Sequence, residues 1–150
     1  HLSGEETLRF YARLCGLRGK KIKQRVDEML EMVSLEDARK RRIGGYSKGM
    51  LQRIGLAQAL IHEPRLLILD EPTAGMSHSE TDYIVELIRK VTEDKTLVMV
   101  EHDMGVVFGL ADRISVLVYG EIIATGAPEE VRANPKVQEA YLGAALEAEH

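Results

Sequence analysis

The sequence predicts an α/β protein whose helices come first, followed by a strand–helix–strand unit and then a hairpin with further helices. Two observations support this prediction. Apolar residues recur at helical spacing up to about residue 62, and two short, unbroken apolar runs then flank a single amphipathic helix. Such runs are typical of parallel strands that are buried on both faces and joined by a crossover helix. We therefore expect a helical subdomain over residues 1–63 and an α/β core over residues 64–150.

The helical part is predicted from capping signals and from the residues that end each helix. The stretch SGEE at 3–6 has the spacing of a capping box, and Gly16 and Gly19 break the helix that follows it. A second helix comes next. The third helix begins at Ser47 and ends before Pro64, because a residue that precedes proline disfavours the helical conformation.

The core is predicted from a βαβ pattern. LLILD at 66–70 and TLVMV at 96–100 are the two apolar runs, and SHSE at 77–80 is a second capping box that starts the helix between them. Strands joined in this way lie parallel in one sheet.

The end of the chain is predicted to hold a β-hairpin among helices. After a short helix near residues 104–111, the run RISVLVYGEIIA indicates a hairpin that turns at Gly120–Glu121. Pro128 and Pro135 stand where the first turn of a helix accepts proline, so the remaining residues are expected to be helical.

Composition excludes several classes of protein. The formal net charge of −4 argues against a nucleic-acid-binding protein. A single cysteine, Cys15, provides no disulfide framework and fits a reducing compartment. No apolar stretch approaches the ~20 residues that span a bilayer, and the first residues lack the pattern of a signal peptide. We expect a cytoplasmic chain that reaches a membrane only through a partner.

Polar residues follow both predicted strands. Asp70–Glu71 comes directly after the first strand, and residues 101–103 (Glu, His, Asp) come after the second. Ligands of open α/β sheets bind outside these carboxyl ends, and carboxylates beside phosphates are ligands for Mg²⁺. There is an alternative interpretation of these residues. Acids that follow strands often cap the next helix, and a lone histidine is often structural rather than catalytic. Pro72 disfavours an immediate helix, however, and Ser77 already supplies the cap.

The start of the third helix offers a complementary feature. Its first turn carries backbone N–H groups and the positive end of the helix dipole, which suit an anion. Ser47 adds a hydroxyl group, and Gly49 allows a ligand to approach the backbone closely. We expect this helix start to be exposed. Any capped helix shares these properties, so the feature gains meaning only in combination with the acids.

In combination, these motifs resemble the ATP-binding subunit of an ABC (ATP-binding cassette) transporter. YSKGMLQRIGLAQAL resembles the family's signature sequence, LLILDEPTAG its Walker B strand, and VMVEHD its switch-histidine segment. ADRISVLVYGEIIATGAPEEV resembles the stretch that follows them. The order and spacing of the motifs also match, so the expected fold is part of a P-loop NTPase-like parallel sheet with a helical subdomain and a C-terminal hairpin.

The resemblance implies roles for particular residues. Asp70 would hold Mg²⁺ through its water shell, Glu71 would polarise the water that attacks the γ-phosphate, and His102 would contact that phosphate. The signature residues Ser47, Lys48, Gly49 and Met50 would bind the γ-phosphate of ATP held by the opposite protomer. Tyr46, Lys48 and Met50 depart from the LSGGQ core of the signature. Ser77 replaces the usual aspartate of the D-loop, so the standard bonding across the dimer is in question.

One motif of the family has no counterpart in the sequence. The pattern G-x-x-x-x-G-K-[ST], which cradles phosphates, does not occur, and GLRGKK at 16–21 fails its spacing. Residues 1–75 resemble exporter-type subunits, whereas residues 76–150 resemble subunits of branched-chain amino-acid importers. We therefore expect the chain to correspond to the carboxyl-terminal portion of a cassette. A natural lineage, a fragment and a chimera would each account for its two kinds of resemblance.

Two function hypotheses remain open. The first is an ATPase subunit that pairs with a second ATP-binding subunit. The pair would bind permease subunits at the inner face of the membrane, and residues 1–33 would form the surface that docks on the permease. The second is a non-catalytic module that offers the signature helix and Glu71 to a partner, because the chain alone is expected to be inactive without a phosphate loop. Chromosome and DNA-repair ATPases share the cassette but separate its halves by long heptad-rich coiled coils, which are absent here.

Overall fold

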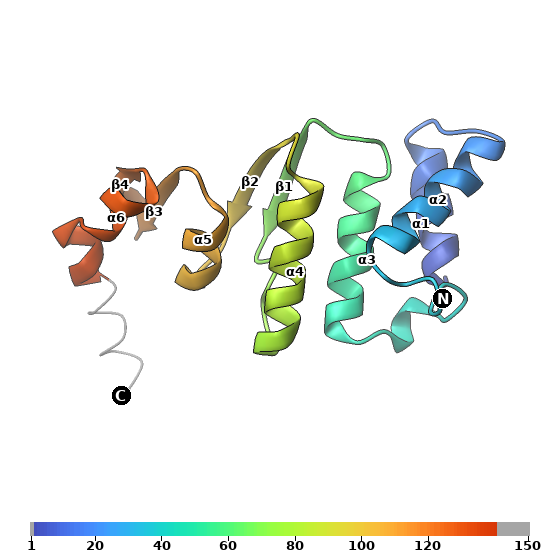
Figure 1. Cartoon of the computed structure of the whole chain (residues 1–150), viewed down its shortest axis with the longest axis horizontal. Helices are drawn as coiled ribbons and strands as arrows, with labels where there is room; N and C mark the ends of the chain where they lie inside the picture. Colours follow the sequence, from blue (N-terminus) through green and yellow to red (C-terminus); the bar gives the residue numbers. More distant parts are fainter. Residues whose placement is uncertain (1, 141–150) are drawn as a thin grey trace. The chain divides into compact units, whose positions relative to one another are not determined.

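The computed structural model describes residues 2–140 and confirms the α/β prediction (Figure 1). The chain forms two compact units, His1–Glu101 and His102–His150. The boundary expected at residues 63 and 64 lies inside the first unit and stays a prediction. The elements of the first unit are α1 (Gly4–Leu14), α2 (Lys20–Met32), the 3-10 turn η1 (Ile43–Gly45), α3 (Lys48–Leu60), β1 (Leu66–Asp70), α4 (His78–Val91) and β2 (Thr96–Val100).

Both predicted capping boxes are present. At the start of α1, the Ser3 hydroxyl group accepts a hydrogen bond from the Glu6 N–H, and the Glu6 carboxylate accepts one from the Ser3 N–H. Ser77 and Glu80 make the same reciprocal pair at the start of α4. These bonds satisfy N–H groups that no helical carbonyl can reach, so both helices begin where the sequence indicates.

The three helices of the N-terminal part pack on a shared apolar core of fully buried side chains. Its largest members are Leu8, Met29, Leu30, Val26, Val33 and Ile61. Arg25 on α2 ties the end of α3 to this core, because its guanidinium donates to the carbonyls of Leu60 and Ile61 at 2.8 and 3.1 Å. A charged donor thereby serves carbonyls that have no partner within the helix.

Tyr46 anchors the loop before α3 to α1. Its side chain is buried, its hydroxyl donates to the Ala38 carbonyl at 2.9 Å, and burial raises the pKa of the phenol. The hydroxyl also lies against Gly4, where an added Cβ would overlap with it. A glycine is therefore needed at the first position of α1.

Replacing Gly4 by alanine is expected to lower the free energy of unfolding by about 1–3 kcal/mol, because the methyl group must displace the buried Tyr46 ring. Gly55→Ala, inside α3, is the matched control. No heavy atom lies within 4 Å of its added Cβ, so it should stabilise the chain by roughly 0.5–1 kcal/mol. Urea denaturation followed by circular dichroism measures both variants. A Gly4→Ala chain as stable as the parent would contradict the predicted overlap.

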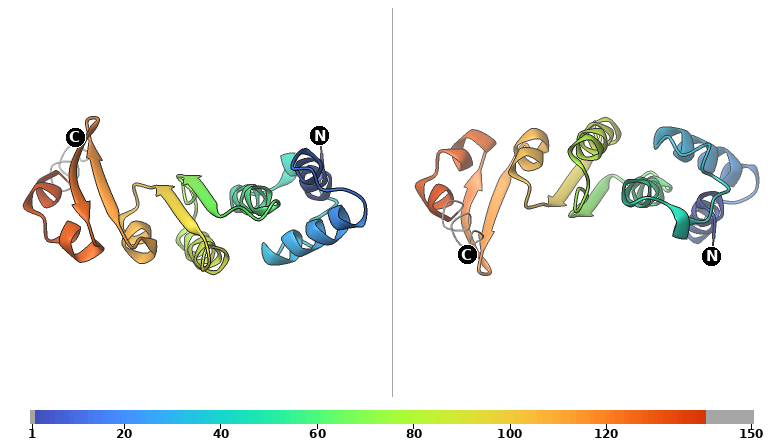
Figure 2. Two further views of the ribbon diagram at one scale, coloured as in Figure 1. Left: turned by 90° about the horizontal axis from the view of Figure 1, so that it is seen from above. Right: turned by 90° about the horizontal axis from the view of Figure 1, so that it is seen from below.

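The βαβ unit forms as predicted, with β1 and β2 parallel and paired from Leu66 with Thr96 to Asp70 with Val100. Helix α4 lies against one face of this two-stranded sheet in both views of Figure 2. Its apolar stripe is buried there and consists of Ile84, Leu87, Ile88 and Val91.

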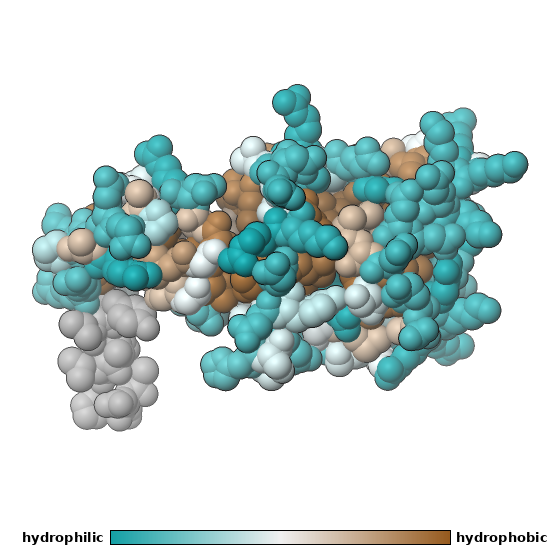
Figure 3. All heavy atoms as spheres, in the orientation of Figure 1, coloured by the Kyte–Doolittle hydropathy of each residue, from teal (hydrophilic) through white to brown (hydrophobic). Residues whose placement is uncertain are grey.

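The expectation that both strands are buried on both faces is wrong. Alternate side chains of the sheet remain exposed, at 51% for Leu66, 66% for Ile68, 47% for Val98 and 59% for Val100. We call these four residues the open sheet face. No described element of the first unit covers it, whereas Leu67 on the opposite face is only 3% exposed. Figure 3 views the molecule from the side of α4, whose outward-facing side chains are largely polar.

The second unit contains α5 (Met104–Leu110), β3 (Ile114–Val118), β4 (Glu121–Gly126) and α6 (Pro128–Arg132). Strands β3 and β4 form the predicted antiparallel hairpin, but it turns at Tyr119 and Gly120, one residue earlier than expected. Both residues have positive φ, +48° and +86°, as a tight two-residue turn requires. Ile114, Val131 and Val137 form the core of this unit.

Proline starts two helices of the second unit, as expected. Pro128 begins α6, and residues 135–140 are helical from Pro135 onward. The rest of that predicted helix lies outside the described residues. No helix between residues 2 and 140 is both long and apolar enough to cross a membrane.

Candidate functional site

The end of β1 places the two predicted acids in an exposed and unusual backbone. Asp70 is the last residue of the strand, and both Asp70 and Glu71 are exposed. Glu71 has a φ of +43°, in the left-handed region that side chains with a Cβ disfavour. Its N–H still donates to the Val100 carbonyl at 2.9 Å, so it stays joined to β2 while the chain turns away. Backbone outliers of this kind cluster at functional sites.

The other acids at the ends of the strands are engaged in local contacts. Glu101, directly after β2, accepts hydrogen bonds from the N–H and the hydroxyl group of Thr73. Asp103 is the N-cap of α5, and its carboxylate accepts from the N–H groups of Gly105 and Val106 at 2.8 and 3.3 Å. The gathering of these acids with the imidazole along one rim stays a prediction, because His102 and Asp103 belong to the second unit. Among residues 2–140, no three His, Cys, Asp or Glu side chains are grouped closely enough to hold a metal ion.

His102 is exposed and begins the second unit. It follows Glu101 directly in the chain, two residues after the end of β2. Its expected contact with the γ-phosphate stays a prediction.

Helix α3 begins as the sequence predicts. Ser47 is the N-cap, and its hydroxyl accepts from the Met50 N–H at 3.2 Å. Ser47 and Lys48 are exposed, but Gly49 is buried, so the expectation of a fully exposed helix start is wrong. The reason is helix α4, because a Cβ on Gly49 would lie 2.9 Å from a carboxylate oxygen of Glu80.

Lys48 brings α3 close to the loop between β1 and α4. Its ammonium group lies against the backbone of Gly75, where an added Cβ would overlap with the nitrogen atom. Gly75 also has a φ of +66°, a backbone conformation that favours glycine at this position. The start of α3 and the segment that follows Glu71 are thus in contact within one chain.

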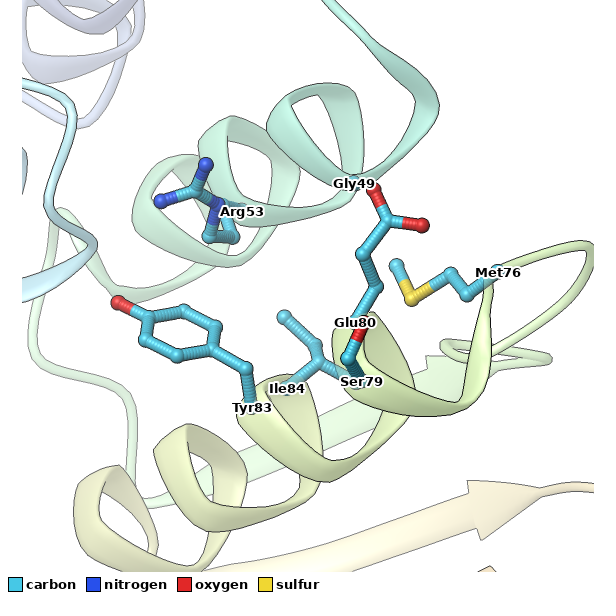
Figure 4. A pocket seen from close by; sticks show the side chains of 7 residues that line it. All are labelled: Gly49, Arg53, Met76, Ser79, Glu80, Tyr83 and Ile84. Carbon is cyan, nitrogen blue, oxygen red and sulfur yellow. The ribbon is translucent and has the colours of Figure 1, made fainter.

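A groove of about 210 Å³ separates the first turns of α3 and α4. Figure 4 shows its lining, in which the Glu80 side chain reaches toward Gly49 and the Arg53 guanidinium lies on the side of Tyr83. The remaining lining residues are Met76, Ser79 and Ile84. The Ser77 N–H and hydroxyl group donate to Glu80 and hold the pKa of its carboxyl below the usual range, so this carboxyl is ionised at neutral pH.

Arg53 and Tyr83 join the helical part to α4. The Tyr83 hydroxyl donates to the Ser34 hydroxyl at 3.0 Å, and Arg53 donates to the carbonyls of Val33 and Ser34 at 2.9 and 3.1 Å. The guanidinium carbon of Arg53 also lies 5.3 Å from the centre of the Tyr83 ring, within the range of a cation–π contact. These contacts keep the start of α3 next to the start of α4.

The sequence did not reveal the partners that hold this region together. Glu80 was visible as part of a capping box, but its contact with Gly49 depends on how two helices meet. Thr73 and Glu101 are separated by 28 positions, and although each stands inside a quoted motif, neither motif indicates that the two residues meet. The available signals were the acid directly after β2 and the threonine directly after Pro72.

These features define an α/β protein whose exposed strand end and capped helix start are suited to phosphate chemistry, and comparison with known proteins identifies the family. Residues 1–74 match the model of the ABC transporter family, and residues 121–147 match that of the branched-chain amino acid ATP-binding cassette transporter. The chain therefore belongs to the ATP-binding cassette family of ABC transporters. The second match confirms the importer-like character predicted for the C-terminal half, whereas the exporter-like character of residues 1–75 stays a prediction.

Several curated proteins are similar to this chain. The ABC transporter ATP-binding protein NatA of Bacillus subtilis is 35% identical over 131 residues, which cover 87% of this chain and 53% of that protein. The high-affinity branched-chain amino acid transport ATP-binding protein BraF of Pseudomonas aeruginosa is 40% identical over 118 residues, or 77% of this chain and 46% of that protein. The chain thus spans about half the length of these relatives.

A solved structure confirms the fold. The ADP conformation of an ATP-binding cassette of an ABC transporter superposes with a TM-score of 0.79 at 23% sequence identity. The match covers 95% of this chain and 63% of that one. At this level of identity, the likeness supports the architecture of the chain and not its activity.

Proposed function

We propose that the chain is the signature-bearing portion of a cassette that hydrolyses MgATP to drive a transporter of the branched-chain amino acid type. The observation that carries this proposal is the end of β1. There Asp70 and Glu71 stand side by side in exposed positions, with Glu71 held in a left-handed backbone. Turnover of a complete cassette that carries Glu71→Gln tests it.

The roles of the acids follow from phosphoryl-transfer chemistry, in which the protein mainly positions groups and neutralises charge. The donor set fits magnesium, which takes one or two carboxylates together with water and phosphate oxygens. Asp70 would hold the ion through its water shell, which would place a positive charge beside the phosphates. Glu71 would orient the attacking water and accept its proton. His102 would contact the γ-phosphate.

The start of α3 would bind the γ-phosphate held by a second ATP-binding subunit. Ser47, Lys48, Gly49 and Met50 would supply a hydroxyl group, an ammonium group and the positive end of the helix. Such a site is complete only in a dimer. Permease subunits would then place the assembly on the cytoplasmic face of the membrane, with this chain contacting no lipid core and no nucleic acid.

Gly49 allows the proposed contact between subunits to be tested. Gly49→Ala is expected to weaken ATP-dependent dimerisation of a complete cassette by more than about tenfold, or about 1.4 kcal/mol. The methyl group would block the approach of the γ-phosphate, while folding would tolerate it because only the carboxylate end of the Glu80 side chain must shift. Analytical ultracentrifugation with and without MgATP measures the effect.

Glu80→Ala is the matched control for Gly49→Ala. It removes the carboxylate that Gly49→Ala would displace, but it leaves the backbone of α3 open to a ligand. We expect its dimerisation constant to stay within about twofold of the parent. Equal losses in the two variants would show that Gly49 serves the contact between α3 and α4, and the signature assignment would then be wrong.

The open sheet face supports the proposal that the chain is an incomplete cassette. Four large apolar side chains on one face of a parallel sheet are typical of a sheet with a further layer. The second candidate function is a non-catalytic module, which the lack of a phosphate-loop pattern in these 150 residues favours. Nucleotide binding by the chain alone separates the two candidates.

A further inference from the structure

The loop between β1 and α4 has a single buried side chain hydroxyl group, that of Thr73, among the residues that the structure describes there. Thr73 is 7% exposed, whereas Glu71 and Gly75 on either side of it are exposed. Both its N–H, at 3.1 Å, and its hydroxyl group donate to the same carboxylate oxygen of Glu101. Hydrogen bonds to a carboxylate are stronger than those between neutral groups, so these two bonds anchor the loop at Thr73.

The rest of the loop depends on this anchor. The Ala74 N–H donates to the Glu71 carbonyl at 3.1 Å, and the Met76 N–H donates to the Thr73 carbonyl at 3.2 Å. The loop is thus bonded to itself on both sides of Thr73. A left-handed glutamate persists only when its surroundings constrain it, and the bonds at Thr73 supply a constraint two residues beyond Glu71.

We propose that Glu101 is a positioning residue which, by holding Thr73, fixes the direction of the Glu71 carboxylate. The inference rests on the proposed function of Glu71. Glu101 would act through Thr73, because its Oε1 atom already accepts two hydrogen bonds from that residue. Since His102 is joined to Glu101 by a peptide bond, the same residue also begins the segment that carries the proposed phosphate contact.

Hydrogen exchange on the full 150-residue chain tests the anchor without any need for ATP turnover. In Glu101→Ala, the amides of Thr73, Ala74 and Met76 are expected to exchange at least about tenfold faster, because their bonds depend on the fixed loop. The Glu71 amide serves as an internal control, since it is bonded to β2. Helices α1 and α3 should keep the protection they have in the parent, which shows that the variant is folded.

Thr73 provides a graded pair of variants. Thr73→Val keeps the shape of the side chain but loses the hydroxyl donor, so it should give part of the acceleration seen in Glu101→Ala. Thr73→Ser keeps the hydroxyl donor, so its amides should exchange at the rates of the parent chain. A purely steric role for Thr73 would reverse this order, and that result would overturn the proposal.

Kinetics of a complete cassette test the consequence for Glu71. Glu101→Ala is expected to lower kcat by about 10- to 100-fold with the KM for MgATP nearly unchanged, because small misplacements of a reacting group have effects of this size. Thr73→Ser should again match the parent. In a Glu71→Gln background, Glu101→Ala should lower kcat by less than about twofold further, because a residue that acts through Glu71 has nothing left to position.

The outcomes separate this proposal from the function on which it rests. If Glu71→Gln alone leaves turnover normal, the proposed function is wrong, and hydrogen exchange still decides whether Glu101 anchors the loop. If Glu71→Gln is inactive but Glu101→Ala turns over like the parent, the positioning role is overturned. Unchanged exchange rates at residues 73–76 in Glu101→Ala overturn it as well.

Discussion

A complete cassette that carries Glu71→Gln is expected to hydrolyse ATP about 10²–10⁴-fold more slowly than the parent while it still binds MgATP. Glutamine has nearly the same shape as glutamate, so it should accept the left-handed backbone at residue 71 equally well. It cannot accept a proton from the attacking water, and it adds no negative charge beside the phosphates. Binding should therefore survive while the chemical step fails.

Phosphate release under saturating MgATP measures turnover, and fluorescence titration with a labelled nucleotide measures binding. Glu86→Gln is the matched control, since Glu86 lies exposed on α4 and pairs with Arg89 at the surface. Its turnover should equal that of the parent. Near-normal turnover in Glu71→Gln would remove Glu71 from the proposed role.

The 150-residue chain alone is expected to show no ATP turnover and at most weak affinity for MgATP. A phosphate loop normally supplies a nest of backbone N–H groups and a lysine to the β- and γ-phosphates. Without that cradle, Asp70 and Glu71 would meet the triphosphate with little compensating positive charge. Magnesium alone cannot replace the lost contacts.

Calorimetry with MgATP and a phosphate-release assay test this second prediction. Glu71→Gln in the isolated chain is the control and should give the same heats as the parent, because there is no assembled site to disturb. Micromolar affinity with steady turnover would show that another segment replaces the phosphate loop. The proposal of an incomplete cassette would then have to be abandoned.

The isolated chain is also expected to self-associate. The open sheet face exposes four large apolar side chains next to strand edges that lack neighbours in the described two-stranded sheet. Exposed apolar surface and unpaired edges both favour pairing with another chain. The starts of α1, α3 and α4 should be unaffected, because each is capped by a serine side chain.

Much of the local structure could be predicted from the sequence because it depends on neighbours along the chain. The capping boxes at Ser3 and Ser77 place two helix starts, and proline places α6. The parallel pairing of β1 and β2 followed from the helix between them. In each case the interaction that determines the structure joins residues only a few positions apart, or two strands connected by a single helix.

Two of the errors arose where distant parts of the chain meet. The start of the third helix was expected to be exposed, but Glu80 from the next helix lies against Gly49. The strands were expected to be buried on both faces because their composition is apolar throughout. Composition reports what a strand can bury, whereas actual burial depends on which other elements are present. The hairpin turn was misplaced by one residue because Tyr119 is rarely found with positive φ.

The candidate site was predicted through motifs rather than through geometry. Asp70, Glu71 and Ser47 were identified by type and order, and the structure adds the backbone and hydrogen bonds that surround them. The pair of Thr73 and Glu101 could not be foreseen, because a hydrogen bond across 28 positions leaves no periodic signal.

The left-handed backbone of Glu71 implies a conflict between folding and activity at this one position. At a φ of +43°, any side chain with a Cβ is disfavoured by roughly 1–2 kcal/mol, whereas glycine adopts this conformation freely. Selection for stability alone would thus favour glycine here. A programme of thermostabilisation that scores residues by backbone preference would choose that replacement first, and it would remove the carboxylate on which the proposed chemistry depends.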